Sequence, residues 1–190
     1  MNLVLLLPVG NVQASLLEDV RLGISKRLKI RCEISSSELD PTPCYHPERQ
    51  QFHSSEILQT IATVICPKDC HMLGITGVDL YIPILKYVFG EAQIGGPCAL
   101  VSFHRLRQEF YGLDRDEALL AERLLKECIH ELGHTLELRH CQDYRCAMAS
   151  AHAVEWIDLR EGSLCESCQS QIDSRRAPGR LRSIYKALLP

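Results

Sequence analysis

The stretch HELGHTLELRHCQDYRCAM, residues 130–148, constrains the fold more than any other part of the chain. His130 and His134 lie four residues apart, so in a helix their imidazoles project from one face, about one turn apart. This is the separation that two ligands of one zinc ion need. Glu131 lies beside them and could take a proton from a metal-bound water, which is the work of a general base.

His140 supplies a third candidate ligand and sets a condition on the fold. If the helix continued, His140 would lie roughly 9 Å beyond His134 and about 120° around the axis, too far for the same ion. The helix must therefore end soon after His134, and the chain must turn back. Three protein ligands leave the fourth position of a tetrahedral zinc open to water, as in catalytic sites. We expect Glu137, near the helix end, to be solvated rather than a fourth ligand.

Four cysteines follow at the spacing of a second metal site. Cys141 and Cys146 form a C-x4-C pair, and Cys165 and Cys168 form a C-x2-C pair eighteen residues further on. Four thiolates are typical of a structural zinc that is closed to water. Because neighbouring residues in extended backbone point to opposite sides, His140 and Cys141 could serve two different metals. We expect the cysteine site to fix the loop that presents His140.

The chain has ten cysteines, which is many for 190 residues. Disulfide bonds would need an oxidising compartment, which nothing in the sequence indicates, so we expect a cytoplasmic protein. Cys66 and Cys70 form a further pair, but no second pair completes a site. The other cysteines are expected to be inert packing thiols: Cys32, Cys44, Cys98 and Cys128.

Length and charge narrow the class of protein. A chain of 190 residues, 46% of them hydrophobic, is long enough for one domain with a substantial core. The net charge of -3 argues against binding to nucleic acid or to an anionic membrane. The start, MNLVLLLPVG, is too short to span a bilayer and lacks a basic segment before its apolar run. It predicts a buried first strand.

Alternating strand and helix patterns predict an α/β (α+β) fold with helices packed on a sheet. The clearest helix covers residues 115–138, with a stripe of Leu120, Leu124, Cys128 and Leu132. We expect one domain, 1–190, with an N-terminal α/β part over 1–134 and a small zinc-stapled part over 135–190. The remaining elements are a helix over 12–28 with Asn11 as N-cap, a strand over 29–36, a loop over 38–52, a helix over 54–65, strands within 71–85, 87–94 and 98–106, and a basic helical tail.

These residues together resemble the archaemetzincin family, within the metzincin clan of zinc peptidases. The family pattern is H-E-x-x-H-x-x-G-x-x-H with a cysteine directly after the third histidine, then C-x-M and a downstream C-x-x-C. The matching residues are His130, Glu131, His134, His140, Cys141, Cys146, Met148, Cys165 and Cys168. The segments GVDLYIP, YVFGEAQIGG and LVSFHRL also look like strands of this family, so the resemblance covers most of the chain.

The resemblance implies a metzincin-like fold, with a twisted mixed sheet and a central active-site helix. It implies a zinc peptidase with two zinc ions, one catalytic and one structural, and Glu131 as the base. Met148 would be the Met-turn residue, an apolar floor under the site that does not bind the metal. VFGEA, residues 88–92, would be the cleft-edge strand that binds extended substrate. The residues after Met148, ASAHAV, are expected in the pocket wall.

Glu137 departs from the family pattern, because it stands where the pattern has glycine. Glycine lets a helix end in a left-handed turn, a conformation that costs another residue about 1 kcal/mol or more. Either Glu137 accepts this strain, or the helix ends differently and His140 binds weakly. Weak binding by His140 would favour an alternative function, a peptide-binding scaffold with one zinc held by the cysteines.

A third alternative is a nucleic-acid-binding zinc module that uses the basic segment SRRAPGRLRSIYK, residues 174–186. Five basic residues in a terminal stretch are more often a solvated helix face, and the whole chain is acidic. The favoured hypothesis is therefore a monomeric peptidase that acts on a peptide or protein substrate and needs neither nucleic acid nor membrane.

Overall fold

The structure is a computed structural model that describes residues 1–64, 67 and 69–176. Its centre is a five-stranded mixed sheet in the order β2-β1-β5-β8-β7. The first four of these strands run parallel, and the edge strand β7 is antiparallel to β8. The strands are β1 (Leu3–Val9), β2 (Arg31–Ile34), β5 (Cys70–Thr76), β7 (Gly90–Ala92) and β8 (Cys98–Ser102).

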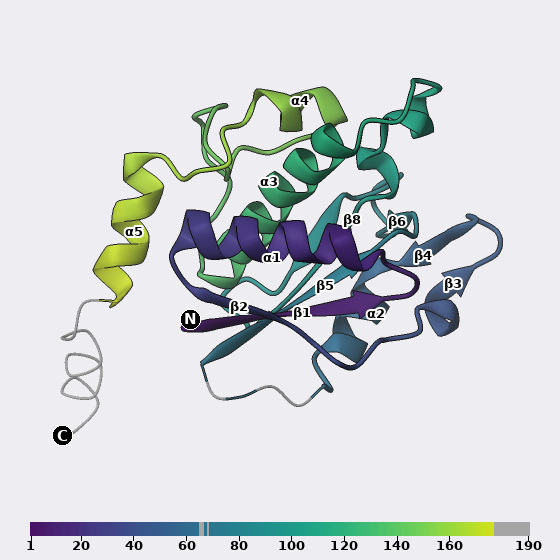
Figure 1. Ribbon diagram of the computed structural model, residues 1–190, viewed down its shortest axis with the longest axis horizontal. Coiled ribbons are helices and arrows are strands. Elements are labelled where there is room, and N and C mark those ends of the chain that lie inside the picture. The colour runs from purple at the N-terminus through teal and green to yellow at the C-terminus, as the bar shows by residue number, and fades with distance from the viewer. Residues whose placement is uncertain (65–66, 68, 177–190) are drawn as a thin grey trace.

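Strand β1 is covered on both faces, which explains its nearly continuous apolar sequence. Val4 and Leu6 pack into one core cluster, whereas Leu7 and Val9 pack into another. Helices α1 (Ala14–Leu28) and α3 (Glu117–Thr135) cover the first face, and the short helix α2 (Ser54–Ile61) covers the second (Figure 1). The expected α/β architecture and buried first strand are confirmed.

A second, three-stranded sheet includes two short strands from the segment that was expected to be a loop. Its order is β3-β4-β6, with β3 (Tyr45–His46), β4 (Gln51–His53) and β6 (Leu80–Tyr81). The prediction of a loop over 38–52 was wrong, because strands of two or three residues are too short to show an alternating pattern. The 3-10 turns are η1 (Thr42–Cys44), η2 (His104–Leu106) and η3 (Gln108–Tyr111).

The start of α1 was also misplaced. Gln13 is the N-cap residue, in extended conformation and without a side-chain cap, and the helix begins at Ala14. The expectation of Asn11 as N-cap was wrong, because the chain makes a turn at Gly10 (φ 67°) before the helix begins.

The C-terminal part contains two helices, α4 (Val154–Leu159) and α5 (Glu166–Arg176). Arg123 of α3 donates from both Nε and Nη2 to the Asp158 carboxylate, at 2.7 and 2.6 Å, which fixes α4 against the central helix. A separate core cluster, formed by Leu138, Cys146, Met148, Cys168 and Ile172, joins α5 to the loop after α3. Most of the expected basic tail, from residue 177 on, lies outside the described residues.

Eight of the described cysteines are free thiols, including the four expected to pack in the core. Burial raises the pKa of Cys32, one of these four, to about 12, which keeps it protonated and inert. Cys70, in contrast, is disulfide-bonded, contrary to the expectation of reduced thiols, and Cys66 lies outside the described residues. Spacing alone does not reveal such a bond. Among the described helices, none is long and apolar enough to cross a membrane.

Candidate active site

Helix α3 presents the candidate catalytic residues. Asp116 caps its start, since its carboxylate accepts a hydrogen bond from the backbone N–H of Leu119 at 2.9 Å. The expected apolar stripe is buried against the sheet and α1: Leu120, Leu124, Cys128 and Leu132. The helix ends at Thr135, one residue after His134, as the sequence requires for a third histidine to reach the other two.

Glu137 accepts the strain that a glycine would avoid, with φ at 66°. Its backbone N–H donates to the carbonyl of His134 at 2.9 Å, and that of Leu138 donates to the carbonyl of Gly133 at 3.0 Å. These two bonds are the pattern of a Schellman motif, whose left-handed position is usually glycine. The turn reverses the chain immediately after the helix, and this reversal brings His140 back toward His130.

The three histidines converge on one point. Each of His130, His134 and His140 offers a ring nitrogen, and these atoms all lie within 4.8 Å of one another. The Nδ1 atoms of His130 and His134 each lie 2.8 Å from a backbone carbonyl, of Ala147 and Leu138 respectively. A carbonyl only accepts, so Nδ1 carries the proton in both rings, and each Nε2 is left as a bare lone pair.

The two Nε2 atoms of His130 and His134 lie 3.1 Å apart. With the protons on Nδ1, neither atom can donate to the other, so their approach suits a shared cation. Two ligands of a tetrahedral zinc, with Zn–N of about 2.0–2.1 Å, are separated by about 3.3 Å. Burial also lowers the pKa of His130, His134 and His140, which keeps the imidazoles neutral and able to bind metal. The histidine cluster therefore fits zinc.

Glu131 lies beside the histidines at a buried position, 5% exposed. Burial raises the pKa of its carboxyl well above the ordinary value, and the charge of Glu127 raises it further, whereas Arg160 opposes the shift. Strand β7 passes very close. A Cβ atom on Gly90 would lie 2.7 Å from the Glu131 Cγ and 2.8 Å from its Oε1, so only glycine fits there without displacing the carboxylate.

A cavity of about 400 Å³ opens next to Glu131. One wall is the segment 85–90, which leads from the loop after β6 into the first residue of β7, and the opposite wall is the segment 150–152, which follows Met148 as expected. Its floor and back are formed by side chains of α3, by His140 and by Arg160. Two of the candidate metal ligands, His130 and His140, and the candidate base Glu131 therefore line a space large enough for a substrate side chain.

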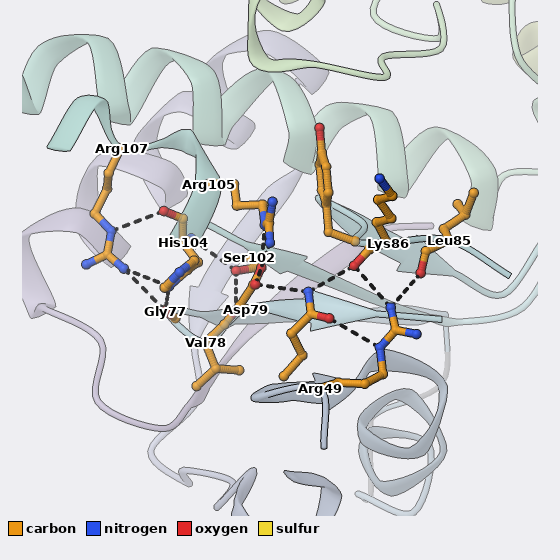
Figure 2. Close-up of polar contacts among 12 residues, drawn as sticks. Arg49, Gly77, Val78, Asp79, Leu85, Lys86, Ser102, His104, Arg105 and Arg107 are labelled. Atoms are coloured by element: carbon orange, nitrogen blue, oxygen red, sulfur yellow. Dashed lines mark hydrogen bonds and ion pairs between the residues drawn. The ribbon is translucent and has the colours of Figure 1, made fainter. Parts of the chain in front are cut away.

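Polar contacts hold both walls of this cavity. The Arg49 guanidinium donates from Nη2 to the carbonyls of Leu85 and Lys86, at 2.9 and 3.2 Å (Figure 2). Gln51 Nε2 donates to the Lys86 carbonyl at 3.0 Å. Across the cavity, the Tyr87 hydroxyl donates to the His152 carbonyl at 2.8 Å. The wall 85–90 is thereby tied both to the small sheet and to the opposite wall.

The four candidate cysteines form a second cluster, with ligand atoms within 4.8 Å of one another. The Sγ atoms of Cys141 and Cys165 lie 3.8 Å apart. That equals the separation of about 3.8 Å for two thiolates on a tetrahedral zinc, with Zn–S of about 2.3 Å. The Cys146 Sγ accepts backbone N–H bonds from Met148 and Cys165, at 3.4 and 3.3 Å. Burial raises the pKa of the Cys146 and Cys168 thiols, so a bound cation is needed to hold them as thiolates.

Met148 lies between the two clusters and is fully buried. Its sulfur lies under Gly133 of α3, where an added Cβ would overlap Sδ. Its carbonyl accepts the backbone N–H of Cys141 at 2.8 Å. The side chain thus packs against the helix turn between His130 and His134.

Sequence reasoning did not identify every group in the cavity. Glu127, one turn before Glu131, and Arg160 form a buried ion pair that lines it, with Nη1 and Oε2 2.7 Å apart. The position of Glu127 on the helix was a usable signal, whereas nothing in the sequence links Arg160 to the motif. Of the remaining histidines, only His152 lines the cavity; His46, His53, His71 and His104 do not.

Comparison with known proteins agrees with the geometry. Residues 55–174 match the model of Peptidase family M54. An archaemetzincin of Methanocaldococcus jannaschii is 38% identical over 168 residues, covering 88% of this chain and 91% of that protein. An archaemetzincin of Thermococcus kodakarensis is 35% identical over 182 residues, covering 90% of this chain and 96% of that protein.

Solved structures show the same fold. A crystal structure of a zinc-dependent peptidase from Methanocorpusculum labreanum superposes with a TM-score of 0.81 at 27% identity, covering 89% of this chain and 99% of that one. Archaemetzincin from Methanopyrus kandleri superposes with a TM-score of 0.76 at 30% identity, covering 91% and 94% of the two chains. The fold, the matched family model and these relatives lead to one conclusion: the chain belongs to peptidase family M54, the archaemetzincins, which are zinc metallopeptidases.

Proposed function

We propose that this chain hydrolyses peptide bonds at the histidine cluster, with Glu131 as general base and His130, His134 and His140 as the zinc ligands. The observation that carries the proposal is the 3.1 Å approach of the His130 and His134 Nε2 atoms, whose protons are on the opposite nitrogens. Zinc bound there would supply a Lewis acid that polarises a peptide carbonyl and makes water more acidic.

Glu131 moves the protons in this proposal. Its carboxylate takes a proton from the attacking water and passes it to the leaving amine. Burial supports this role, because the raised pKa of the Glu131 carboxyl makes it a stronger base than an exposed glutamate. The close backbone of Gly90 restricts the position of the carboxylate, so it is already oriented before substrate binds.

Strand β7 is the proposed docking edge for substrate. It pairs with β8 on one side only and ends the five-stranded sheet. Gly90 is also the residue in contact with Glu131, so a peptide added as a further strand would run past the catalytic carboxylate. We assign the substrate to peptides or proteins in extended conformation.

A second zinc is assigned to the cysteine cluster, with Cys141, Cys146, Cys165 and Cys168 as ligands. This site has no place for water if all four thiolates bind, so its role is structural. Met148 is assigned as the apolar floor of the histidine site, without binding metal. We further propose a monomeric, cytoplasmic protein of one domain that needs neither nucleic acid nor membrane.

The alternative is a scaffold with the cysteine zinc alone and no catalysis. The scaffold was considered because Glu137 replaces a glycine. The Schellman turn at Glu137 supports the catalytic proposal instead, because this turn brings His140 close to the other histidines. The two functions differ in metal content and in turnover.

Replacement of Glu131 by Gln separates catalysis from metal binding. We expect E131Q to bind as much zinc as the wild type and to lose hydrolysis of an unstructured protein such as denatured casein. The control is E122Q on the same helix, whose carboxylate pairs with Arg27 at the surface and does not line the cavity. Hydrolysis by E131Q at the wild-type rate contradicts the assignment of the base.

A further inference from the structure

The cavity beside the candidate catalytic residues has a charged floor. The Arg160 guanidinium is 1% exposed and the Glu127 carboxylate is 5% exposed. Arg160 donates from Nη1 to Glu127 Oε2 at 2.7 Å. Both residues line the same cavity as His130 and Glu131, so the ion pair lies at the boundary of the space that a substrate would enter.

This ion pair leaves part of the guanidinium without a partner. The Arg160 Nε is buried and has no hydrogen-bond partner among the described residues. Guanidinium N–H groups are strong donors, and a buried donor without an acceptor is unfavourable. A group that brings an acceptor into the cavity would remove this penalty, whereas an apolar group would cover the donor and keep it unpaired.

The charges around the cavity restrict the entering group further. Lys86 and Arg160 are the cationic residues of its lining, and Glu127 and Glu131 are the acidic ones. Glu127 already occupies one edge of the guanidinium. A lysine or arginine side chain would bring only further N–H donors and no acceptor for the Arg160 Nε. A planar carboxyl-type oxygen, in contrast, matches the geometry of the free guanidinium edge. The volume of about 400 Å³ accommodates a side chain of this size.

We infer that Arg160 determines specificity, and that the cavity takes a substrate side chain that ends in a carboxylate or carboxamide oxygen, next to the bond to be cut. The oxygen accepts the hydrogen bond that the Arg160 Nε lacks. This inference rests on the proposed peptidase function, because it places a substrate residue beside Glu131. Glu127 is the positioning residue, since it holds the other edge of the guanidinium.

Peptide binding tests this inference without turnover. Zinc-loaded E131Q is titrated with fluorescent peptides of one common sequence, and binding is followed by anisotropy. Two series place Glu, Gln or Met on the amino or the carboxyl side of the same peptide bond. Met matches Gln in length but lacks the acceptor oxygen. We expect Gln or Glu to bind about tenfold tighter than Met in one series, and the comparison of Gln with Glu separates carboxamide from carboxylate recognition.

The double variant E131Q/R160K keeps a positive charge that can pair with Glu127. It lacks the planar guanidinium and its Nε–H group. We expect it to reduce the preference over Met to less than about threefold. R145K is the matched control, because Arg145 pairs with Glu161 at the surface, outside this cavity. It should keep the full preference. If R160K does not fold, as judged by circular dichroism, the Gln-to-Met ratio in E131Q alone decides.

Equal binding of all three peptides in both series, no measurable binding of any, or an unchanged preference in R160K overturns the inference. The wild-type enzyme then separates this failure from failure of the proposed function. Cleavage without preference contradicts the role of Arg160 alone. A preference in binding without cleavage of any peptide contradicts the peptidase function alone.

Discussion

His140 and Cys141 are adjacent in the chain, yet their side chains belong to two different ligand clusters. His140 joins the histidines of α3, and Cys141 joins the cysteines of the C-terminal part. The backbone N–H of Cys141 is also bonded to the Met148 carbonyl, at 2.8 Å. A single peptide therefore connects the two sites, and the position of one ligand depends on the position of the other.

This connection predicts that loss of the cysteine site weakens the histidine site. In C168S one thiolate is missing, so the structural zinc is held less tightly and the loop that carries His140 loosens. We expect fewer than one zinc per chain and a lower melting temperature. Cys44, a buried thiol outside both clusters, provides the control C44A, which should keep the wild-type zinc content. Full zinc content in C168S contradicts the coupling.

The left-handed turn at Glu137 predicts an effect on stability. Its φ of 66° costs a residue with a Cβ about 1 kcal/mol relative to glycine. E137G should therefore be more stable to urea than E137A by about 1 kcal/mol. Because both variants lack the carboxylate, their comparison isolates the backbone strain. Equal stability of the two variants would mean that the turn relaxes in alanine.

The close packing of Gly90 on Glu131 predicts a catalytic effect. The Cβ of G90A would lie 2.8 Å from the Leu100 carbonyl as well as 2.7 Å from the Glu131 Cγ, so either the strand or the carboxylate must move. A shift of this kind in a catalytic group reduces turnover about 100-fold. We expect G90A to lose kcat and to keep its zinc, measured on the same preparation. Wild-type kcat in G90A rules out this positioning.

Stability is predicted to fall in mild acid, partly because of His104. Burial lowers the pKa of this imidazole, and the neighbouring Arg107 and Arg105 lower it further, whereas Asp79 and the Gly77 carbonyl oppose the shift. The unfolded chain therefore binds a proton near pH 6.5 that the folded chain resists, so stability falls as the pH drops below that value.

Because His104 is only partly buried, its share should be less than about 1 kcal/mol. The variant H104N cannot titrate but can still donate to the Gly77 carbonyl, which His104 Nδ1 contacts at 3.1 Å. The midpoint of urea unfolding is measured at pH 7.5 and 5.5 after a chelator has removed the metal. The difference between the two midpoints should be smaller in H104N than in the wild type. An equal difference would assign the acid sensitivity to other groups.

The sequence was sufficient to predict those parts of the site whose geometry is determined by the spacing of the candidate ligands. The position of His140 required α3 to end soon after His134, and the helix does end at Thr135. Because His140 and Cys141 are adjacent, the sequence also required their side chains to point to different clusters, the histidines and the cysteines. The short strands β3 and β4 and the helix α4 were missed, because elements of so few residues carry no periodic pattern.

The cavity floor was missed for a different reason. Arg160 is separated from Glu127 by 33 positions, and only the packing of α4 against α3 brings the two together. Glu137 shows the opposite case. The sequence raised the question of strain at this position, but only the backbone hydrogen bonds of the turn show that glutamate adopts the conformation of glycine.

The central claim is that two zinc ions are held by two ligand sets joined at one peptide. The direct test is zinc per chain, measured by mass spectrometry of metals on purified wild type and H140A. The account predicts two zinc ions in the wild type and one in H140A, which keeps the cysteine cluster. One zinc ion in both proteins would contradict the account and favour the scaffold.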